Sequence, residues 1–124
     1  IEREAEQLRF PGGYLYFQLL EKVPEHFSED PKVAYFDFET LAFPLMLRKW
    51  RAGDQFQPFG MGGKHQKVQD YFSNHKFTRA EKAAAWMLAD DSGTLLWVVG
   101  HRSNHANRVR PSTKQCLKVS VLPD

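Results

Sequence analysis

The sequence predicts one domain of the α+β class, a mostly antiparallel β-sheet or sandwich with two short helices in the middle. Three observations support this class. The length of 124 residues fits one domain. Hydrophobic residues make up 42% of the chain and aromatic residues 14%, which is typical of a globular protein. Short, partly alternating apolar segments flank a central region whose apolar residues recur at helical spacing.

The N-terminal third is predicted to hold one helix and two strands. Residues 2–9 alternate acidic and basic side chains, and we assign residues 1–12 as a short helix or linker. The sequence Pro11-Gly12-Gly13 ends this segment. Residues 14–23 and 32–41 are rich in aromatic and aliphatic side chains, which predicts two strands.

The middle of the chain is predicted to pass from a strand through a loop into two helices. Residues 45–50 form a third strand, and the glycine-rich residues 51–64 form a loop. Residues 67–75 place several apolar side chains on one helical face. Thr78 begins a second helix, with Glu81 completing a capping box.

The last third is predicted to be β-structure. Residues 86–89 form a strand, residues 90–93 a hairpin turn, and residues 94–100 the returning strand. A basic loop over residues 101–111 then leads to a final strand at residues 115–122.

Charge is divided unevenly along the chain. Residues 1–44 hold four basic and nine acidic side chains, a net charge of −5, whereas residues 45–118 hold thirteen basic and five acidic ones, a net charge of +8. Such a division indicates that one part of the protein meets a polyanion. An ordinary solvated surface remains the alternative.

Composition also bounds the cellular setting. Cys116 is the only cysteine, so no internal disulfide can form, and it is expected to be a small core residue of a protein in a reducing compartment. No apolar run approaches the roughly 18 residues that span a bilayer. We therefore expect a cytoplasmic protein. The first residue is not Met, which favours a piece of a longer chain.

Motifs of catalysis, metal binding and nucleotide binding are incomplete. Gly60, Gly62 and Gly63 precede Lys64, but the next residue is His65 rather than the hydroxyl residue of a phosphate-binding loop. His101 and His105 lie in a predicted loop and do not make a metal site by themselves. We therefore expect no catalytic residues, no metal and no cofactor in this chain.

Basic residues give the stronger functional signal. Lysine and arginine neutralise phosphates, and the neighbouring Ser103, Asn104 and Asn107 could donate to sugar and phosphate oxygens. The sequence also assigns turn or structural roles to Gly53, Asp54, Pro58 and Gly60. The candidate RNA-binding residues are Arg48, Lys49, Arg51, Lys64, Lys67, Arg102, Arg108 and Arg110.

Three ordered segments resemble the C-terminal domain of the tRNA(Ile)-lysidine synthetases. They are residues 47–60 (LRKWRAGDQFQPFG), 67–72 (KVQDYF) and 97–102 (WVVGHR). The resemblance implies a fold like the small β-rich domain shared with the phenylalanyl-tRNA synthetase β subunit. Basic positions that match the family are Arg48, Arg51, Lys67 and Arg102.

The resemblance also implies a function. The parent enzyme would be a bacterial ligase of tRNA modification that uses ATP and Mg²⁺ to attach lysine to the wobble cytidine of an isoleucine tRNA with a CAU anticodon. That chemistry belongs to an N-terminal domain with an S-G-G-x-D-S loop. This chain would bind the tRNA body near the acceptor stem, with the catalytic domain of the same protein as its other partner.

Two other functions stay open from the sequence. The chain could be a structural module that braces the catalytic domain or forms a homodimer, with little RNA contact. It could also be a free-standing enzyme that uses the loop from Gly60 to Lys64 as a nucleotide site.

Overall fold

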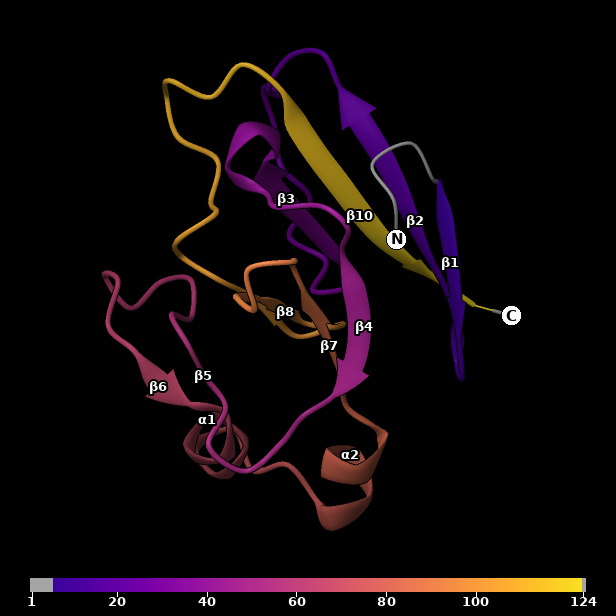
Figure 1. Cartoon of the computed structure of the whole chain (residues 1–124), viewed down its shortest axis with the longest axis vertical. Helices are drawn as coiled ribbons and strands as arrows, with labels where there is room; N and C mark the ends of the chain where they lie inside the picture. Colours follow the sequence, from indigo (N-terminus) through magenta and orange to yellow (C-terminus); the bar gives the residue numbers. More distant parts are fainter. Residues whose placement is uncertain (1–5, 124) are drawn as a thin grey trace.

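Two antiparallel β-sheets pack face to face, and two short helices lie beyond the second sheet (Figure 1). The computed structural model describes residues 6–123. This arrangement confirms the predicted α+β class with antiparallel sheets and two helices in the middle of the chain. Among the described residues, none of the helices has the length and apolar character needed to cross a membrane.

The first sheet, sheet A, has the strand order β1-β2-β10-β3. Its last strand in sequence lies between two early strands, so the two ends of the chain meet in one sheet. The strand bounds are β1 Gln7–Phe10, β2 Gly13–Leu20, β3 Val33–Asp37 and β10 Cys116–Leu122.

The second sheet, sheet B, has the order β4-β7-β8-β9, and a two-stranded ribbon pairs β5 with β6. The strand bounds are β4 Met46–Lys49, β5 Gln55–Phe56, β6 Gln66–Lys67, β7 Trp86–Ala89, β8 Leu95–Val98 and β9 Arg102–Ser103. The helices are η1 Phe38–Thr40, α1 Val68–Asn74 and α2 Arg79–Ala84.

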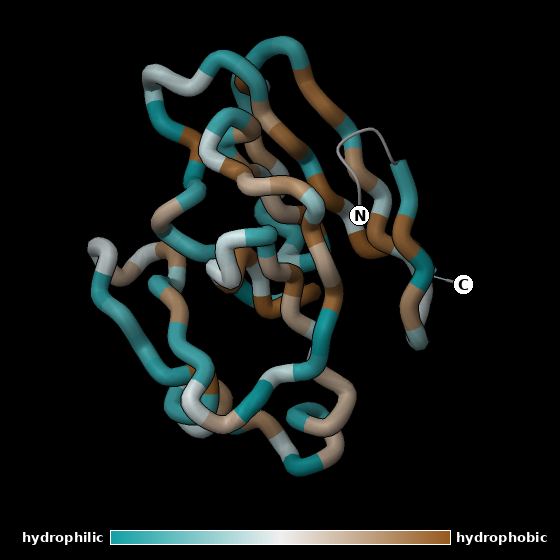
Figure 2. Tube along the Cα trace, viewed as in Figure 1, coloured by the Kyte–Doolittle hydropathy of each residue, from teal (hydrophilic) through white to brown (hydrophobic). Residues whose placement is uncertain are grey.

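Sheet B has a hydrophobic core on each face. On β7, Leu88 joins the core shared with sheet A, whereas Met87 and Ala89 join the core that includes helix α1. All four residues of β8 are buried for the same reason, which explains why its sequence is continuously apolar. Figure 2 shows hydrophobic stretches along the strands of both sheets and mostly polar loops between them.

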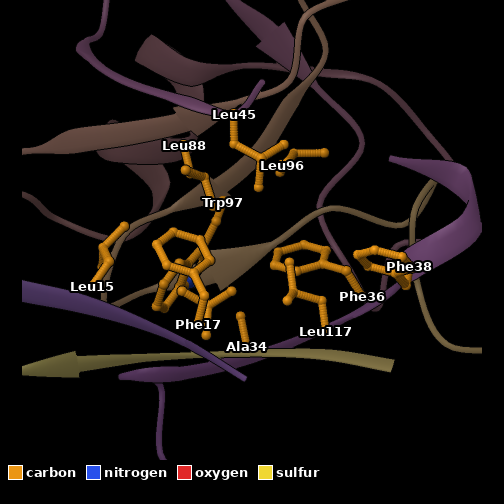
Figure 3. Close-up of a cluster of buried hydrophobic side chains, with 11 residues drawn as sticks. Leu15, Phe17, Ala34, Phe36, Phe38, Leu45, Leu88, Leu96, Trp97 and Leu117 are labelled. Atoms are coloured by element: carbon orange, nitrogen blue, oxygen red, sulfur yellow. The ribbon is translucent and has the colours of Figure 1, made fainter. Parts of the chain in front are cut away.

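The core between the sheets is made by large side chains from both of them. Trp97 of β8 is only 1% exposed and packs there. Figure 3 shows side chains of Leu45, Leu88, Leu96 and Trp97 on one side and of Leu15, Phe17, Ala34, Phe36 and Leu117 on the other. Burial of this apolar surface provides the main driving force for joining the two sheets.

The N-terminal prediction is wrong for the residues that the structure describes. Residues 2–9 are expected to be helical, but β1 begins at Gln7 and pairs with β2 across the turn that follows Phe10. Leu8 and Phe10 pack on the core, so alternating burial and pairing override the local charge pattern. The remainder of the predicted helix, residues 2–5, lies outside the described residues.

Most other predicted elements are present, with shorter bounds. The predicted strand at residues 32–41 ends at Asp37, where the 3₁₀ helix η1 begins. Both predicted helices are confirmed, including the capping box of Thr78 and Glu81. Residues 51–64 were expected to be loop, but Gln55–Phe56 forms β5, which pairs with β6.

Candidate nucleic-acid interface

Two segments that are distant in sequence lie side by side; the second was expected to be a loop, but it contains the short strand β9. We call residues 57–64 the glycine loop and residues 101–110 the arginine segment. Two backbone hydrogen bonds join them: Phe59 N–H donates to Ser103 O at 2.9 Å, and His105 N–H donates to Gln57 O at 2.6 Å; together they form an isolated antiparallel bridge between Pro58 and Asn104. The fold therefore brings two predicted basic regions onto one side of the protein (Figure 1).

Four of the predicted RNA-binding residues lie on these two segments. Lys64 is exposed at the end of the glycine loop. In the arginine segment, the Arg108 guanidinium donates to His105 O at 2.9 Å, and that of Arg110 donates to Ala106 O at 3.4 Å. These bonds hold the two guanidinium groups close to their own backbone.

Arg102, the fourth of these residues, is oriented by three neighbours. Its Nη1 donates to Phe59 O at 3.3 Å, and its Nη2 lies 3.4 Å from Nε2 of His75. Its guanidinium carbon is 5.9 Å from the ring centroid of Tyr71. The neighbours of Arg102 come from the glycine loop and from helix α1, so sequence spacing gives no sign of them.

The surroundings of His101 and His105 in the arginine segment favour the neutral form of each imidazole. The pKa of His101 is lowered, mainly by burial. The charge of nearby Glu81 partly opposes this shift, and that of His75 adds to it. Desolvation also lowers the pKa of His105, and the positive charges of Arg108 and Arg110 lower it further. Both shifts favour the uncharged imidazole at pH 7, so lysine and arginine supply the main positive charge of these two segments.

A second basic region surrounds Asp54, in the turn between β4 and β5. Arg48 forms a two-bond ion pair with this carboxylate, at 2.9 Å and 3.0 Å. The backbone N–H of Arg51 donates to the same carboxylate at 2.7 Å, and Gly53 between them has a φ of +92°. Asp54 O also accepts from Val68 N at the start of α1, so the turn connects sheet B to that helix.

The pKa of Asp54 reflects these contacts. Burial raises the pKa, but hydrogen bonds from Arg48 and the Arg51 backbone, and the charges of both arginines, outweigh it and hold the pKa below its usual value. The charge of Arg48 is therefore largely neutralised within the protein. The Arg48 side chain is only partly exposed, and its ion pair with Asp54 stabilises this turn.

Lys49 is also engaged within the protein. Its ammonium donates to Ala83 O at 2.8 Å, near the C-terminal end of helix α2, and lies 4.4 Å from the ring centroid of Trp86. A cation at this end of a helix is favourable. The two remaining predicted residues of this region are exposed: Arg51 lies in the Asp54 turn, and Lys67 pairs with Gln55, the residue after Asp54.

The two asparagines of the arginine segment do not face solvent. Asn104 is 2% exposed and donates to Leu95 O and Asn107 Oδ1. Asn107 is 6% exposed and donates to Thr40 O and Thr40 Oγ1. The expectation that these side chains donate to RNA oxygens is wrong, because both are buried and serve to fix the segment on sheet B and η1.

The glycine loop depends on backbone conformations that glycine favours. Gly60, Gly62 and Gly63 have φ values of +94°, +63° and +85°. A Cβ on Gly63 would lie 3.3 Å from the His105 ring, so the two segments approach closely there. Pro58 at the start of the loop is buried. The loop is therefore shaped by conformation and by contact with the arginine segment.

No group of three or more potential metal ligands occurs within residues 6–123. The His101 ring contacts the Phe77 ring at a tilt of 54°, with centroids 4.7 Å apart, whereas His105 lies against Gly63. His101 and His105, which were weighed as metal ligands from the sequence, therefore contact different parts of the protein.

Sequence comparisons relate the chain to curated tRNA(Ile)-lysidine synthases. The relative from Parabacteroides distasonis is 46% identical over 95 residues, which are 77% of this chain and 21% of that protein. The relative from Bacteroides thetaiotaomicron is 33% identical over 75% of this chain and 21% of that protein. The chain thus spans about a fifth of the length of these relatives. No family model matches the chain.

Two solved structures share the fold of this chain. One is the crystal structure of the TilS C-terminal domain, with a TM-score of 0.79 and 22% identity over 94% of this chain and 89% of that one. Another is an N-terminal fragment of the phenylalanyl-tRNA synthetase β subunit from Pyrococcus horikoshii, with a TM-score of 0.60 and 18% identity over 70% and 27% of the two chains.

The fold is thus a small antiparallel α+β domain, similar to the TilS C-terminal domain and to the fragment of the phenylalanyl-tRNA synthetase β subunit. The sequence relatives narrow this class. The chain belongs to the tRNA(Ile)-lysidine synthase family, in which it corresponds to the C-terminal domain.

Proposed function

We propose that this chain is the tRNA-binding domain of a tRNA(Ile)-lysidine synthase and is not itself catalytic. The observation that carries the proposal is the meeting of the glycine loop and the arginine segment, which gathers Lys64, Arg102, Arg108 and Arg110 on one side of the protein. Cationic side chains of this kind neutralise phosphates. A-form RNA is recognised mostly through its backbone, 2′-hydroxyls and shape.

The complete enzyme would attach lysine to the wobble cytidine of an isoleucine tRNA with a CAU anticodon, using ATP and Mg²⁺ in a separate catalytic domain. This step of tRNA modification would take place in the cytoplasm. The present domain would hold the body of the tRNA near its acceptor stem, and it would raise the effective concentration of the tRNA at the catalytic domain.

We propose different roles for the eight candidate residues according to their contacts inside the protein. Arg48 and Lys49 use their charged groups on Asp54 and on Ala83 O, so they would position the surrounding backbone. The exposed residues Arg51, Lys64 and Lys67 would contact phosphates directly. Arg102, Arg108 and Arg110 would contribute their remaining N–H donors.

The test is a titration of the purified chain with isoleucine tRNA at several salt concentrations, with binding measured by fluorescence anisotropy. Each lost phosphate contact should reduce the log–log salt slope by about 0.7–0.9. Arg51→Ala and Lys64→Ala should each show this reduction together with weaker binding. Lys118→Ala is the matched control, since Lys118 lies on β10 between two core residues and so points to the outer face of sheet A.

An unchanged affinity and slope in both Arg51→Ala and Lys64→Ala would refute the assignment of these contacts. Light scattering supplies the opposing outcome. A stable dimer that binds no tRNA would instead support a structural module that braces the catalytic domain or a second copy of the chain.

A further inference from the structure

A cavity of about 460 Å³ lies between the segment before β3 and the two basic segments. Its lining includes buried residues of both sheets, Ala34 and Trp97, and side chains of the glycine loop and the arginine segment. The volume is within the range of roughly 300–1,000 Å³ that is usual for small-ligand sites. The cavity is therefore large enough for a compact organic group.

Aromatic side chains line both sides of this cavity. Phe27, from the segment before β3, is 44% exposed, and Phe59, from the glycine loop, is 50% exposed. Tyr35 meets Phe27 edge to face at 4.8 Å, and its hydroxyl accepts the Ser28 N–H at 3.0 Å, so its ring is held in place. Exposed aromatic rings beside a cavity provide planar surfaces on which a flat ring can stack.

Charged groups of opposite sign line different walls. Arg102 and Arg108 come from the arginine segment, and Glu29 and Asp30 come from the segment before β3. Arg102 is held by Phe59 O and Arg108 by His105 O, so both guanidinium groups are pre-positioned. A ligand that fits this arrangement has a flat ring, an anionic group toward the arginines, and an N–H donor toward the carboxylates.

A nucleotide has these three features. Its phosphate pairs with arginine, its base stacks on aromatic rings, and the exocyclic amine of adenine, cytosine or guanine donates to a carboxylate. Uracil has no exocyclic amine. A base inside a duplex is covered by its stacked neighbours and its pairing partner, so only an unpaired nucleotide can enter.

We propose that this cavity binds one unpaired RNA nucleotide that carries an exocyclic amine, with its base between Phe27 and Phe59 and its phosphate beside Arg102 and Arg108. The proposal rests on the proposed tRNA-binding function and adds a site for a single-stranded part of that RNA. In this arrangement Arg102 and Arg108 serve the unpaired nucleotide, and the basic residues outside the cavity, Arg51, Lys64, Lys67 and Arg110, bind the duplex body next to it.

The test compares binding of the purified chain to four RNAs: a blunt duplex, and pentamers of adenylate, cytidylate and uridylate. The adenylate and cytidylate pentamers are expected to bind more tightly than the uridylate pentamer. Phe59→Ala should weaken binding of the adenylate pentamer by about five- to a hundredfold, and leave duplex binding unchanged. The backbone bonds of Phe59 survive this change, because only the exposed ring is removed.

Two further variants sharpen the comparison. Glu29→Gln should reduce the preference for adenylate over uridylate, because it removes an anionic acceptor from the cavity wall. Leu19→Ala is the matched control: Leu19 is 43% exposed on β2 and does not line the cavity, so all four affinities should stay as in the parent chain.

The outcomes separate this proposal from the one on which it rests. If the duplex binds but Phe59→Ala changes nothing, the cavity proposal is overturned and the tRNA-binding function stands. An equal loss on duplex and pentamer would also overturn it, since the ring would then act by holding the loop. If neither duplex nor pentamer binds, both proposals fail. With intact tRNA, removal of the unpaired 3′ nucleotides tests whether they are the occupant.

Discussion

Asp54 shows how one carboxylate organises a turn in this domain. It accepts two bonds from Arg48 and one from the Arg51 backbone, and its own carbonyl accepts from the start of helix α1. The sequence predicts that Asp54 bonds backbone N–H groups next to a glycine with an unusual φ. The sequence does not predict that Asp54 pairs with Arg48. Its positive charge alone made Arg48 a candidate for phosphate contact instead.

Removing the charge of Asp54 should destabilise the domain. We expect Asp54→Asn to lower the free energy of unfolding at pH 7 by about 1–3 kcal/mol, since Arg48 then loses its charged acceptor. The folded-state pKa of Asp54 is lowered, so this contribution is complete above the unfolded carboxyl pKa of about 3.9, and it disappears as the pH falls through the folded pKa.

Urea denaturation at several pH values measures this effect. The difference between the parent chain and Asp54→Asn should shrink as the pH falls, while Asp91→Asn, a change at an exposed residue of the hairpin turn, should have a small effect throughout. Equal stability of Asp54→Asn and the parent chain at pH 7 would show that the ion pair contributes nothing.

In the arginine segment, residue types alone do not predict which polar side chains can contact RNA. Its arginines and asparagines are interleaved, and both types suit RNA contact. The structure separates them, because Asn104 and Asn107 are buried and bond to sheet B and η1. Only the tertiary contacts of this segment decide which polar residues point inward, so no sequence pattern could have distinguished them.

At the scale of elements, local signals predicted best. Helix α2 has its cap and its capping-box partner within four residues, and both bonds are present at 2.9 Å and 3.0 Å. The strands β7 and β8 are joined by a short turn and were also predicted. Strand β1 was missed because its partner β2, rather than its own sequence, determines its conformation.

The cap of helix α2 should contribute measurably to stability. Thr78→Ala removes the hydroxyl that accepts the Glu81 N–H, and we expect a loss of about 1 kcal/mol in the free energy of unfolding. Thr78→Ser keeps the hydroxyl and is the control, with most of the stability retained. Thermal unfolding followed by circular dichroism measures both, and equal loss in the two variants would exclude the cap as the cause.

At the scale of the whole molecule, the uneven charge of the sequence corresponds to a division in space. The acidic first 44 residues supply three strands of sheet A and η1, whereas the basic residues 45–118 supply sheet B, helices α1 and α2, both basic segments and the start of β10. The sequence predicted this division and the antiparallel class. It could not predict the strand order, which depends on pairing between segments that are far apart in the chain.

The shared core should make the two sheets unfold together. Leu96→Ala, in the core between the sheets, should lower the free energy of unfolding by about 2–5 kcal/mol. Leu19→Ala, at an exposed position of β2, should change it by less than about 0.5 kcal/mol. Tryptophan fluorescence and far-UV circular dichroism should give the same urea midpoint in each variant, and separate midpoints would contradict a common core.

The position of β10 has a consequence for how this protein is made. Leu20 pairs with Cys116, so close to a hundred residues must be synthesised between two neighbouring strands of sheet A. Until the ribosome has released β10, strands β2 and β3 lack the strand that lies between them. We therefore expect sheet A to form only after translation of this domain is nearly finished, and loss of β10 by premature termination to leave its strands open to aggregation.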